Sequence, residues 1–337
     1  MKAVLLEKPG PLASGPLALR DDVPDPVAGP GQVLIRVSSC GVCHSNLHMV
    51  EGDWLPATPA FTPIVPGHEV VGRVAALGDG VTGFTLGDRV GVQPLWSTCG
   101  RCDYCRTGRE ELCADKLITG ESVHGGYAEL MVADAGFTHL LPDDLDDVAA
   151  APLFCPGITG YGAVLKAALL PGERVAIFGL GGVGHLALQF AQLTGATTIA
   201  VTRGAARRQM ASELGADHTV DANTDDRIRV LRRHGGVDAA IVFAPSDQVV
   251  GQALQAVRPG GRLILGVNAT IGGFPFATEK TITGSLLGNR VMMDTVLALA
   301  SAGKVRVVAE AMPLAEAGTA LRRLKAGEVR GRLVLVP

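Results

Sequence analysis

The feature that most constrains the fold is a glycine-rich turn in the segment RVAIFGLGGVGHLALQFAQL, residues 174–193. Gly179, Gly181 and Gly184 have the spacing G-x-G-x-x-G and stand between an apolar strand and an amphipathic helix. Glycines at these positions permit a tight turn and close approach of a pyrophosphate, and the helix N-terminus offers N–H groups to an anion. The segment therefore predicts a dinucleotide-binding βαβ unit rather than a ligand-free turn. The other residues of the predicted turn are Leu180, Gly182 and Val183.

The sequence changes character along the chain. Up to about residue 150, short β-branched runs such as QVLIRV and VVGRVAAL alternate with Gly, Pro and Asp, which is typical of a β-rich domain. From about residue 160, continuous apolar strands alternate with helices, which predicts a parallel sheet covered on both faces. After about residue 285 this alternation ends, and we expect the tail, which closes with the strand RLVLV, to return to the first domain.

The residues that follow the predicted strand 197–201 bear on the choice of cofactor. An NAD site usually has Asp or Glu there to hold the adenosine ribose hydroxyls, whereas this chain has Thr202 and Arg203, with Arg207 and Arg208 close behind. A hydroxyl and a guanidinium can both bind a phosphate. The sequence therefore favours NADP(H) over NAD(H), with Thr202, Arg203 and Arg207 as contacts. The alternative is that these arginines form the solvated face of a helix.

Four cysteines lie close together in CGRCDYCRTGREELC: Cys99, Cys102, Cys105 and Cys113. Gaps of two, two and seven residues separate them. Short gaps let one turn present successive thiolates to a tetrahedral Zn²⁺, and four thiolates leave no position for water. The pattern predicts a structural zinc site rather than free thiols.

Cys43, His68 and Cys155 form a second, dispersed set of possible metal ligands. Cys43 and His68 follow strands in glycine-flanked turns, and Cys155 lies in PLFCPGITGYG at the predicted domain junction. Two thiolates and an imidazole leave one position open, as a catalytic zinc requires. Spacing alone leaves open the alternative that these three residues are ordinary buried side chains. We interpret Cys40 in that way, as a small buried apolar residue.

Composition excludes several classes of function. The formal net charge of −3 gives no electrostatic basis for binding nucleic acid or an anionic membrane. The N-terminal MKAVLLEKPG does not resemble a signal peptide, and no apolar run approaches the roughly 20 residues that cross a bilayer. We therefore expect a cytoplasmic protein, in which cysteines serve metal binding or catalysis more often than disulfides.

Taken together, these motifs resemble those of the zinc-dependent medium-chain alcohol dehydrogenases. The resemblance runs from MKAVLLEKPG to GRLVLV and is most specific in CGVCHSNLH, PGHEVVG, the four-cysteine segment and GLGGVG. It implies an α/β fold with a GroES-like, β-rich catalytic domain formed by residues 1–155 and 286–337. A Rossmann domain with a doubly wound parallel sheet, residues 156–285, would be inserted between these two segments.

The resemblance also implies roles for individual residues. Cys43, His68 and Cys155 correspond to the catalytic zinc ligands, and Glu69 to a carboxylate that approaches the metal transiently. Ser45 corresponds to the residue that accepts the alcohol proton, and His48 to the one that passes it to solvent. The implied cofactor contacts are His44, Thr159 and Arg332, and the implied substrate-pocket residues are Trp54 and Trp96.

One position departs from the family pattern. The family usually has Asp where this chain has Asn46, and that Asp holds a zinc-ligating histidine. An amide oxygen can accept a hydrogen bond but carries no charge, so the basicity of the imidazole and the reactivity of the zinc should differ. Changes of this kind are worth roughly 10–100-fold in metal affinity or activity.

The predicted activity is reversible hydride transfer between a primary alcohol or aldehyde and NADP(H) or NAD(H), with one catalytic and one structural Zn²⁺. Three alternatives stay open: a reductase of the same fold acting on an imine or activated alkene, a polyol dehydrogenase, and a non-enzymatic nucleotide-sensing zinc protein. Because relatives are dimers or tetramers, we also expect a homo-oligomer.

Overall fold

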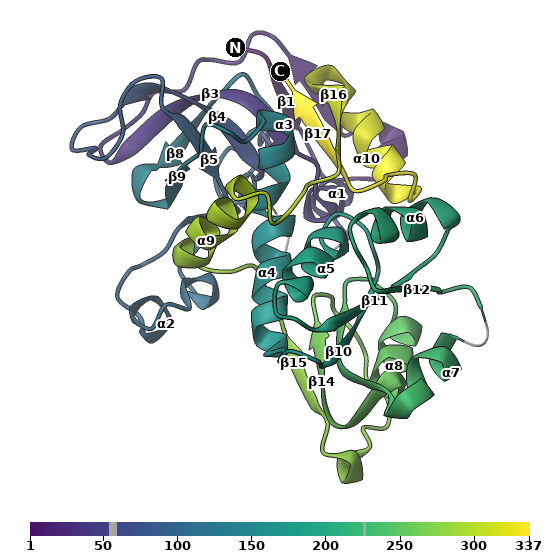
Figure 1. The fold of residues 1–337 in the computed structure, drawn as a ribbon. Helices are drawn as coiled ribbons and strands as arrows, with labels where there is room; N and C mark the ends of the chain where they lie inside the picture. Colours follow the sequence, from purple (N-terminus) through teal and green to yellow (C-terminus); the bar gives the residue numbers. More distant parts are fainter. Residues whose placement is uncertain (54–58, 225–226) are drawn as a thin grey trace. The chain divides into compact units, whose positions relative to one another are not determined.

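The computed structural model describes residues 1–53, 59–224 and 227–337 and divides the chain into two compact units (Figure 1). Unit 1 contains Met1–Cys155, Asn289–Ser301 and Val308–Pro337, and unit 2 contains Pro156–Gly288 and Ala302–Val307. Trp54 lies outside the described residues.

The short segment Ala302–Val307 joins unit 2, whereas we predicted one uninterrupted tail from residue 286 in the first domain. Two hydrogen bonds tie it there: Arg306 N donates to Gln189 Oε1 over 2.8 Å, and Gln189 Nε2 donates to Arg306 O over 2.9 Å. The sequence carries no local pattern that indicates this pairing.

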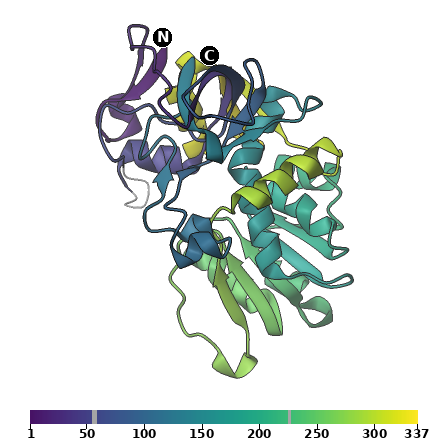
Figure 2. The ribbon, with the colours of Figure 1, turned by 90° about the vertical axis from the view of Figure 1, so that its left-hand side faces the viewer.

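Unit 1 is built on a seven-stranded sheet whose strands come from both ends of the chain (Figure 2). The order is β16-β17-β3-β4-β5-β9, with β8 also paired to β3. The strands are β3 (Gln32–Gly41), β4 (Val70–Leu77), β5 (Arg89–Val92), β8 (Leu130–Asp134), β9 (Thr138–Leu140), β16 (Ala309–Pro313) and β17 (Arg332–Val336). Smaller sheets pair β1 (Ala3–Leu6) with β2 (Leu17–Arg20) and β6 (Leu95–Ser97) with β7 (Leu117–Ile118). The helices are α1 (His44–Glu51), α2 (Asp103–Arg106), α3 (Asp147–Ala150), α9 (Arg290–Ser301) and α10 (Ala317–Lys325).

The register of this sheet brings two distant turns together. Strands β3 and β4 are antiparallel, and Cys40 near the end of β3 lies opposite Val70 at the start of β4. Alternating apolar residues of β3, such as Val33 and Ile35, are fully buried in the core of unit 1 and hold this register. The residues that follow β3 and those that precede β4 therefore meet at the same end of the sheet.

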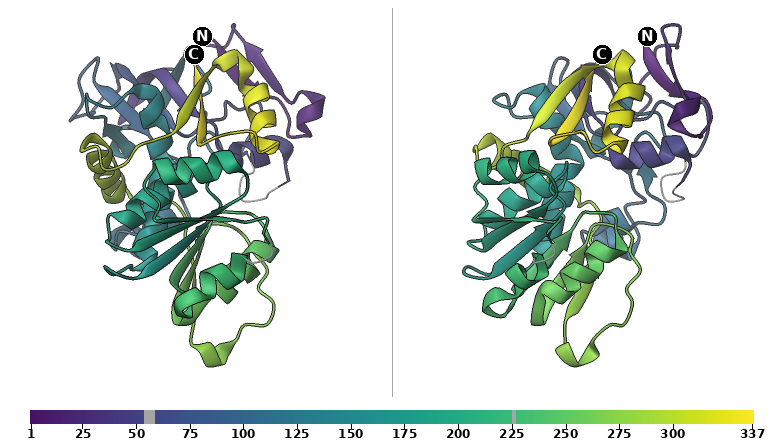
Figure 3. Two further views of the ribbon diagram at one scale, coloured as in Figure 1. Left: turned by 45° about the vertical axis from the view of Figure 1, so that its right-hand side comes forward. Right: turned by 90° about the vertical axis from the view of Figure 1, so that its right-hand side faces the viewer.

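Unit 2 is a six-stranded parallel sheet with the order β12-β11-β10-β13-β14-β15, which is that of a Rossmann fold. Helices cover both faces, with α4–α6 on one side and α7 and α8 on the other (Figure 3). The strands are β10 (Arg174–Phe178), β11 (Thr197–Thr202), β12 (His218–Asp221), β13 (Val237–Val242), β14 (Val257–Leu265) and β15 (Thr281–Gly284). The helices are α4 (Pro156–Ala167), α5 (Gly184–Gln192), α6 (Ala205–Glu213), α7 (Arg227–Arg232) and α8 (Asp247–Ala256).

The α/β fold class with a β-rich domain and a Rossmann sheet is confirmed. In the described parts of the chain, no single helix has the length and apolar character needed to cross a membrane. One broken pair, Asp147–Phe154 with Pro156–Ala167, satisfies that test by length and composition only.

Candidate active site and zinc sites

Cys43, His68, Glu69 and Cys155 converge at one end of the unit 1 sheet. Their candidate ligand atoms all lie within 4.8 Å of one another. Cys43 caps the N-terminus of α1, directly after β3, and His68 and Glu69 lead into β4. Cys155 follows the 3₁₀ helix Ala151–Phe154. The structure thus brings together residues that span more than 100 positions of the sequence.

The donor atoms fit a zinc ion. The sulfurs of Cys43 and Cys155 are 3.8 Å apart, and two thiolates about 2.3 Å from a tetrahedral zinc are separated by about 3.8 Å. His68 is 2% exposed, and neither of its ring nitrogens has a hydrogen-bond partner among the described residues. A buried imidazole without partners costs free energy, and a metal ligated by one ring nitrogen would remove part of that cost.

The two cysteine thiols interact strongly with each other. Their contact lowers the pKa of Cys43 well below its ordinary value and raises the pKa of Cys155, so Cys43 loses its proton first. Arg332 and His68 also favour the Cys43 thiolate, although burial opposes it. Thiolate is the form that binds metal, so the site already favours one of its ligands in that form.

Glu69 forms a buried ion pair with Arg332. The Arg332 guanidinium donates from Nε to Glu69 Oε2 over 3.1 Å and from its NH2 group to Glu69 Oε1, and both residues are at most 2% exposed. Gly41 is required beside them, because a Cβ at Gly41 would lie 1.9 Å from Glu69 Oε2. We predicted Arg332 as a cofactor contact; here its guanidinium holds Glu69 next to the ligand cluster.

Asn46 is fully buried on α1. Its Oδ1 accepts hydrogen bonds from the Cys43 backbone N–H at 3.4 Å and from the Tyr127 hydroxyl at 3.3 Å. Its Nδ2 has no partner among the described residues. The side chain therefore orients the backbone of Cys43 and makes no hydrogen bond to His68, which differs from the role that the family pattern implies.

Ser45, His48 and His44 all lie on α1. Ser45 Oγ is buried without a hydrogen-bond partner in the described part of the chain. His48 is partly exposed, and its Nδ1 lies 2.7 Å from Asp53 Oδ1. His44 is the exposed first residue of the helix. Ser45 and His48 are three positions apart, which puts them on the same face of a helix.

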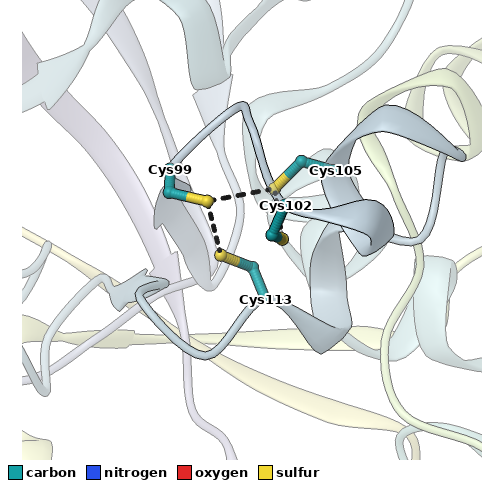
Figure 4. Close-up of side chains that lie close together, drawn as sticks. All are labelled: Cys99, Cys102, Cys105 and Cys113. Atoms are coloured by element: carbon teal, nitrogen blue, oxygen red, sulfur yellow. Dashed lines mark hydrogen bonds between the residues drawn. The ribbon is translucent and has the colours of Figure 1, made fainter.

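The four clustered cysteines converge as well. The sulfur–sulfur distances are 3.5 Å for Cys102–Cys105, 3.6 Å for Cys99–Cys113 and 3.9 Å for Cys99–Cys105 (Figure 4). These distances bracket the value of about 3.8 Å expected for thiolates around a tetrahedral zinc. The backbone N–H groups of Arg101 and Cys102 contribute to a pKa of about 6 for Cys99. The cluster therefore fits a closed, structural zinc site.

An ion pair that sequence reasoning missed anchors this cysteine lobe, residues 95–118. Arg290 at the start of α9 donates from Nε and NH2 to both carboxylate oxygens of Glu110, over 3.0–3.2 Å. The Arg290 guanidinium also lies 4.2 Å from the ring centroid of Phe137, and Asn289 Nδ2 donates to Gly108 O over 2.6 Å. The partners are about 180 positions apart, so no local motif could indicate them.

The glycine turn of unit 2 has the geometry that its spacing predicts. Gly179 has φ +93°, and a Cβ at Gly184 would lie 1.9 Å from Gly179 O. A Cβ at Gly181 would meet no atom within 4 Å, so the backbone there is open to a ligand. Leu180 is buried, whereas Gly182 and Val183 are half-buried before α5 begins. The turn and helix N-terminus together suit a pyrophosphate.

The end of β11 carries the predicted residues that distinguish the two cofactors. Thr202 is 4% exposed, whereas Arg203 is exposed and pairs with no residue that the structure describes. The nearest carboxylate on the neighbouring strand, Asp221, forms an ion pair with Arg208 at 2.6 Å. Arg207 is half-buried on α6. Thr159 lies half-buried on α4.

Two further side chains of unit 1 are Trp96, which we predicted in the substrate pocket, and Glu121. Trp96 is half-buried on β6, and its Nε1 has no hydrogen-bond partner within the described ranges. Glu121, which sequence reasoning missed, is 9% exposed on the loop after β7. A single glutamate in a loop gives no sequence signal of burial, so only the structure identifies it.

The comparisons with known proteins agree with this geometry. Two family models match the chain: "Alcohol dehydrogenase GroES-like domain" over residues 29–143 and "Zinc-binding dehydrogenase" over residues 182–302. An alcohol dehydrogenase of Geobacillus stearothermophilus is 40% identical over 321 residues, which are 93% of this chain and 94% of that protein.

Solved structures are similar over the whole chain. The alcohol dehydrogenase of the archaeon Aeropyrum pernix has a TM-score of 0.92 at 37% identity and covers 100% of both chains. A cobalt- and zinc-bound thermostable alcohol dehydrogenase of Pyrobaculum aerophilum has a TM-score of 0.90 at 29% identity, over 100% of this chain and 99% of that one.

Proposed function

Because the chain belongs to the zinc-dependent medium-chain alcohol dehydrogenases, we propose that it interconverts primary alcohols and aldehydes and favours NADP(H) over NAD(H). The observation that carries the proposal is the convergence of Cys43, His68 and Cys155 within 4.8 Å. In the oxidative direction the substrate carbon loses a hydride to the nicotinamide and the substrate oxygen loses a proton, so an aldehyde, NAD(P)H and H⁺ are formed.

Residues of unit 1 would hold the metal and leave room for the substrate. Bound zinc would act as a Lewis acid on the substrate oxygen while the nicotinamide carries the hydride. Cys43, His68 and Cys155 would hold the metal and leave one position open. Glu69 would approach that position transiently, and its ion pair with Arg332 would limit that movement.

Ser45 and His48 would move the proton. The buried Ser45 Oγ has no hydrogen-bond partner in the described ranges and so can accept the proton of a substrate hydroxyl. His48 is 37% exposed and contacts Asp53, which suits a group that passes protons to water. A group at the boundary between the protein interior and solvent is well suited to this task.

The preference for NADP(H) is supported by the charges at the end of β11. The Arg203 guanidinium, which has no partner in the described part of the chain, can bind a phosphate on the adenosine ribose. The nearest carboxylate, Asp221, is neutralised by Arg208, so it is a poor partner for ribose hydroxyls. His44, Thr159 and the glycine turn would supply the remaining cofactor contacts.

Steady-state kinetics test this proposal. We expect turnover of primary alcohols and aldehydes, with kcat/KM at least about tenfold higher for NADP(H), the equivalent of one charged hydrogen bond. Arg203→Asp should reverse this preference, whereas Arg322→Asp, an exposed arginine in unit 1, should preserve it. A preference for NAD(H) that is the same in the parent and Arg203→Asp would contradict the assignment.

A second candidate, reduction of an imine or activated alkene, is favoured by one observation. Asn46 is neutral and bonds to Cys43 and Tyr127 rather than to His68, so the electrostatics of the zinc site differ from the family pattern. Product analysis with matched aldehydes, enones and imines separates the two reactions. The homo-oligomer stays a prediction, which light scattering of the purified protein would test.

A further inference from the structure

The carboxylate of Glu121 has no role in the proposed reaction and no partner among the residues that the structure describes. Glu121 is 9% exposed, and its side chain makes no hydrogen bond or ion pair with any described residue. By contrast, Glu69 is paired with Arg332 and Glu110 with Arg290. A carboxylate buried without a partner costs free energy, so an unpaired one indicates a role in binding something else.

The loop that carries Glu121 is attached to the segment that carries His68. Gly126 N donates to Gly67 O over 2.9 Å. A Cβ at Gly120 would lie 2.8 Å from Gly67 N, so the two backbones are in direct contact. Glu121 follows Gly120 and His68 follows Gly67, so the backbone of Glu121 lies beside the segment that carries His68.

The electrostatics agree with this position. Burial raises the pKa of Glu121 to about 7, the charge of His68 lowers it and that of Cys43 raises it further. Both ligands are therefore close enough for their charges to act on Glu121. The carboxylate is nevertheless not one of the four residues whose donor atoms lie within 4.8 Å of one another, so holding the metal does not account for it.

We propose that Glu121 forms an anionic subsite that selects alcohols and aldehydes carrying a cationic group, such as a quaternary or protonated amine, beyond the reacting carbon. This inference rests on the proposed function, because it names the substrate class of the same site. A cationic substrate would supply a positive charge that no described residue supplies, whereas an apolar tail would leave the largely buried Glu121 without one.

The test uses pairs of primary alcohols with the same shape and different charge. Choline and 3,3-dimethylbutan-1-ol form one pair, and their homologues with one more methylene form a second pair. The quaternary nitrogen cannot ligate zinc. We expect the ratio of kcat/KM, cationic over neutral, to be at least about tenfold larger in the parent enzyme than in Glu121→Gln, the effect of one charged contact.

Glu328→Gln is the matched control, since Glu328 is exposed and loses the same charge. It should keep the parent ratio. Calorimetric binding of each alcohol to the zinc-loaded enzyme with NADP(H) gives a second ratio that does not depend on turnover. Equal ratios for the parent and Glu121→Gln in both measurements would overturn the subsite. If no alcohol or aldehyde is converted, the proposed function fails, while the binding ratio still decides the role of Glu121.

Discussion

The two cysteine sites of unit 1 have similar sulfur–sulfur distances, but their ligands are distributed differently along the chain. The lobe site takes four ligands from 15 consecutive residues, Cys99–Cys113, whereas the other site draws Cys43, His68 and Cys155 from three separate turns. The first can form from local chain geometry around a metal. The second exists only after β3 and β4 have paired in register. We therefore expect the locally assembled site to serve stability and the site assembled by the fold to serve catalysis.

The largest expected effect comes from removing a ligand of the dispersed site. Cys155→Ser replaces a thiolate by a poor zinc ligand, and the effect should exceed the roughly 10–100-fold typical of residues that merely support a ligand. We expect turnover to fall by more than about 100-fold and the zinc content to fall from two ions to one per chain. Kinetics and elemental analysis measure these quantities.

The fold should survive this change, because β3 and β4 are held by their backbone pairing and by buried apolar residues such as Val33 and Ile35. The thermal unfolding temperature of Cys155→Ser should therefore resemble that of the parent protein with zinc in the lobe site only. A variant that keeps two zinc ions and full turnover would show that Cys155 is not a ligand.

The reciprocal change, Cys113→Ser in the lobe, should act mainly on stability. Structural zinc contributes directly to folding free energy, and Cys113 is fully buried. We expect stability to fall by about 3 kcal/mol, the upper end of the usual range for a single substitution. The remaining folded protein should keep much of its turnover per catalytic zinc. Urea unfolding monitored with zinc release checks this, and a loss confined to turnover would reverse the roles assigned to the two sites.

This contrast also explains what the sequence could predict. The lobe cysteines and the glycine turn lie within short segments, so spacing and local geometry sufficed to identify them. Cys43, His68 and Cys155 were ambiguous from spacing because their convergence depends on strand register, and the family resemblance was needed to group them. Arg332 with Glu69, Arg290 with Glu110 and the unpaired Glu121 depend on tertiary packing, for which the chain carries no local pattern.

Asn46→Asp changes the surroundings of the dispersed site without removing a ligand. Neither ring nitrogen of His68 has a hydrogen-bond partner in the described ranges, although Nε2 lies 4.0 Å from Glu69 Oε1. A carboxylate at position 46 could accept a hydrogen bond from the imidazole and strengthen it as a ligand. We expect zinc affinity to rise by about tenfold, the lower end of such effects. Competition with a chelator measures it, and Asn223→Asp, a change at an exposed asparagine of unit 2, is the control. Equal zinc retention in all three proteins would show that position 46 does not act on the metal.

Arg290→Met tests whether α9 stabilises the lobe. The substitution keeps most of the apolar side chain but leaves Glu110, which is 6% exposed, without its bidentate partner. An unsatisfied charged group of this kind costs about 1–3 kcal/mol. We expect the lobe zinc to be lost at lower chelator concentration while the catalytic zinc is retained. The double variant Arg290→Met with Glu110→Leu should recover part of the loss, since it removes the unpaired carboxylate.

The smallest expected effect is on the pH dependence of stability. It concerns His139, which contacts α9 through Asp294. His139 is 6% exposed, and its Nδ1 lies 2.8 Å from Asp294 Oδ1 on that helix. Burial lowers the pKa of His139 below its ordinary value; Asp294 and Glu110 oppose the shift, and Arg290 adds to it. The folded protein therefore binds this proton less readily than the unfolded chain, in which histidine titrates near about 6.5.

His139 therefore contributes its full share to the free energy of unfolding above about pH 6.5. This contribution decreases as the pH falls from that value toward the lowered pKa of the folded state, by at most about 1.4 kcal/mol per pH unit. His139→Gln should reduce the difference between urea midpoints at pH 7.5 and pH 5.5, whereas His218→Gln, at an exposed histidine of unit 2, should leave it unchanged. Because protonation of thiolates also weakens both zinc sites in acid, the comparison of the two variants isolates the histidine. If both variants show the parent's pH dependence, acid acts on the cysteine sites alone and not on the packing of α9.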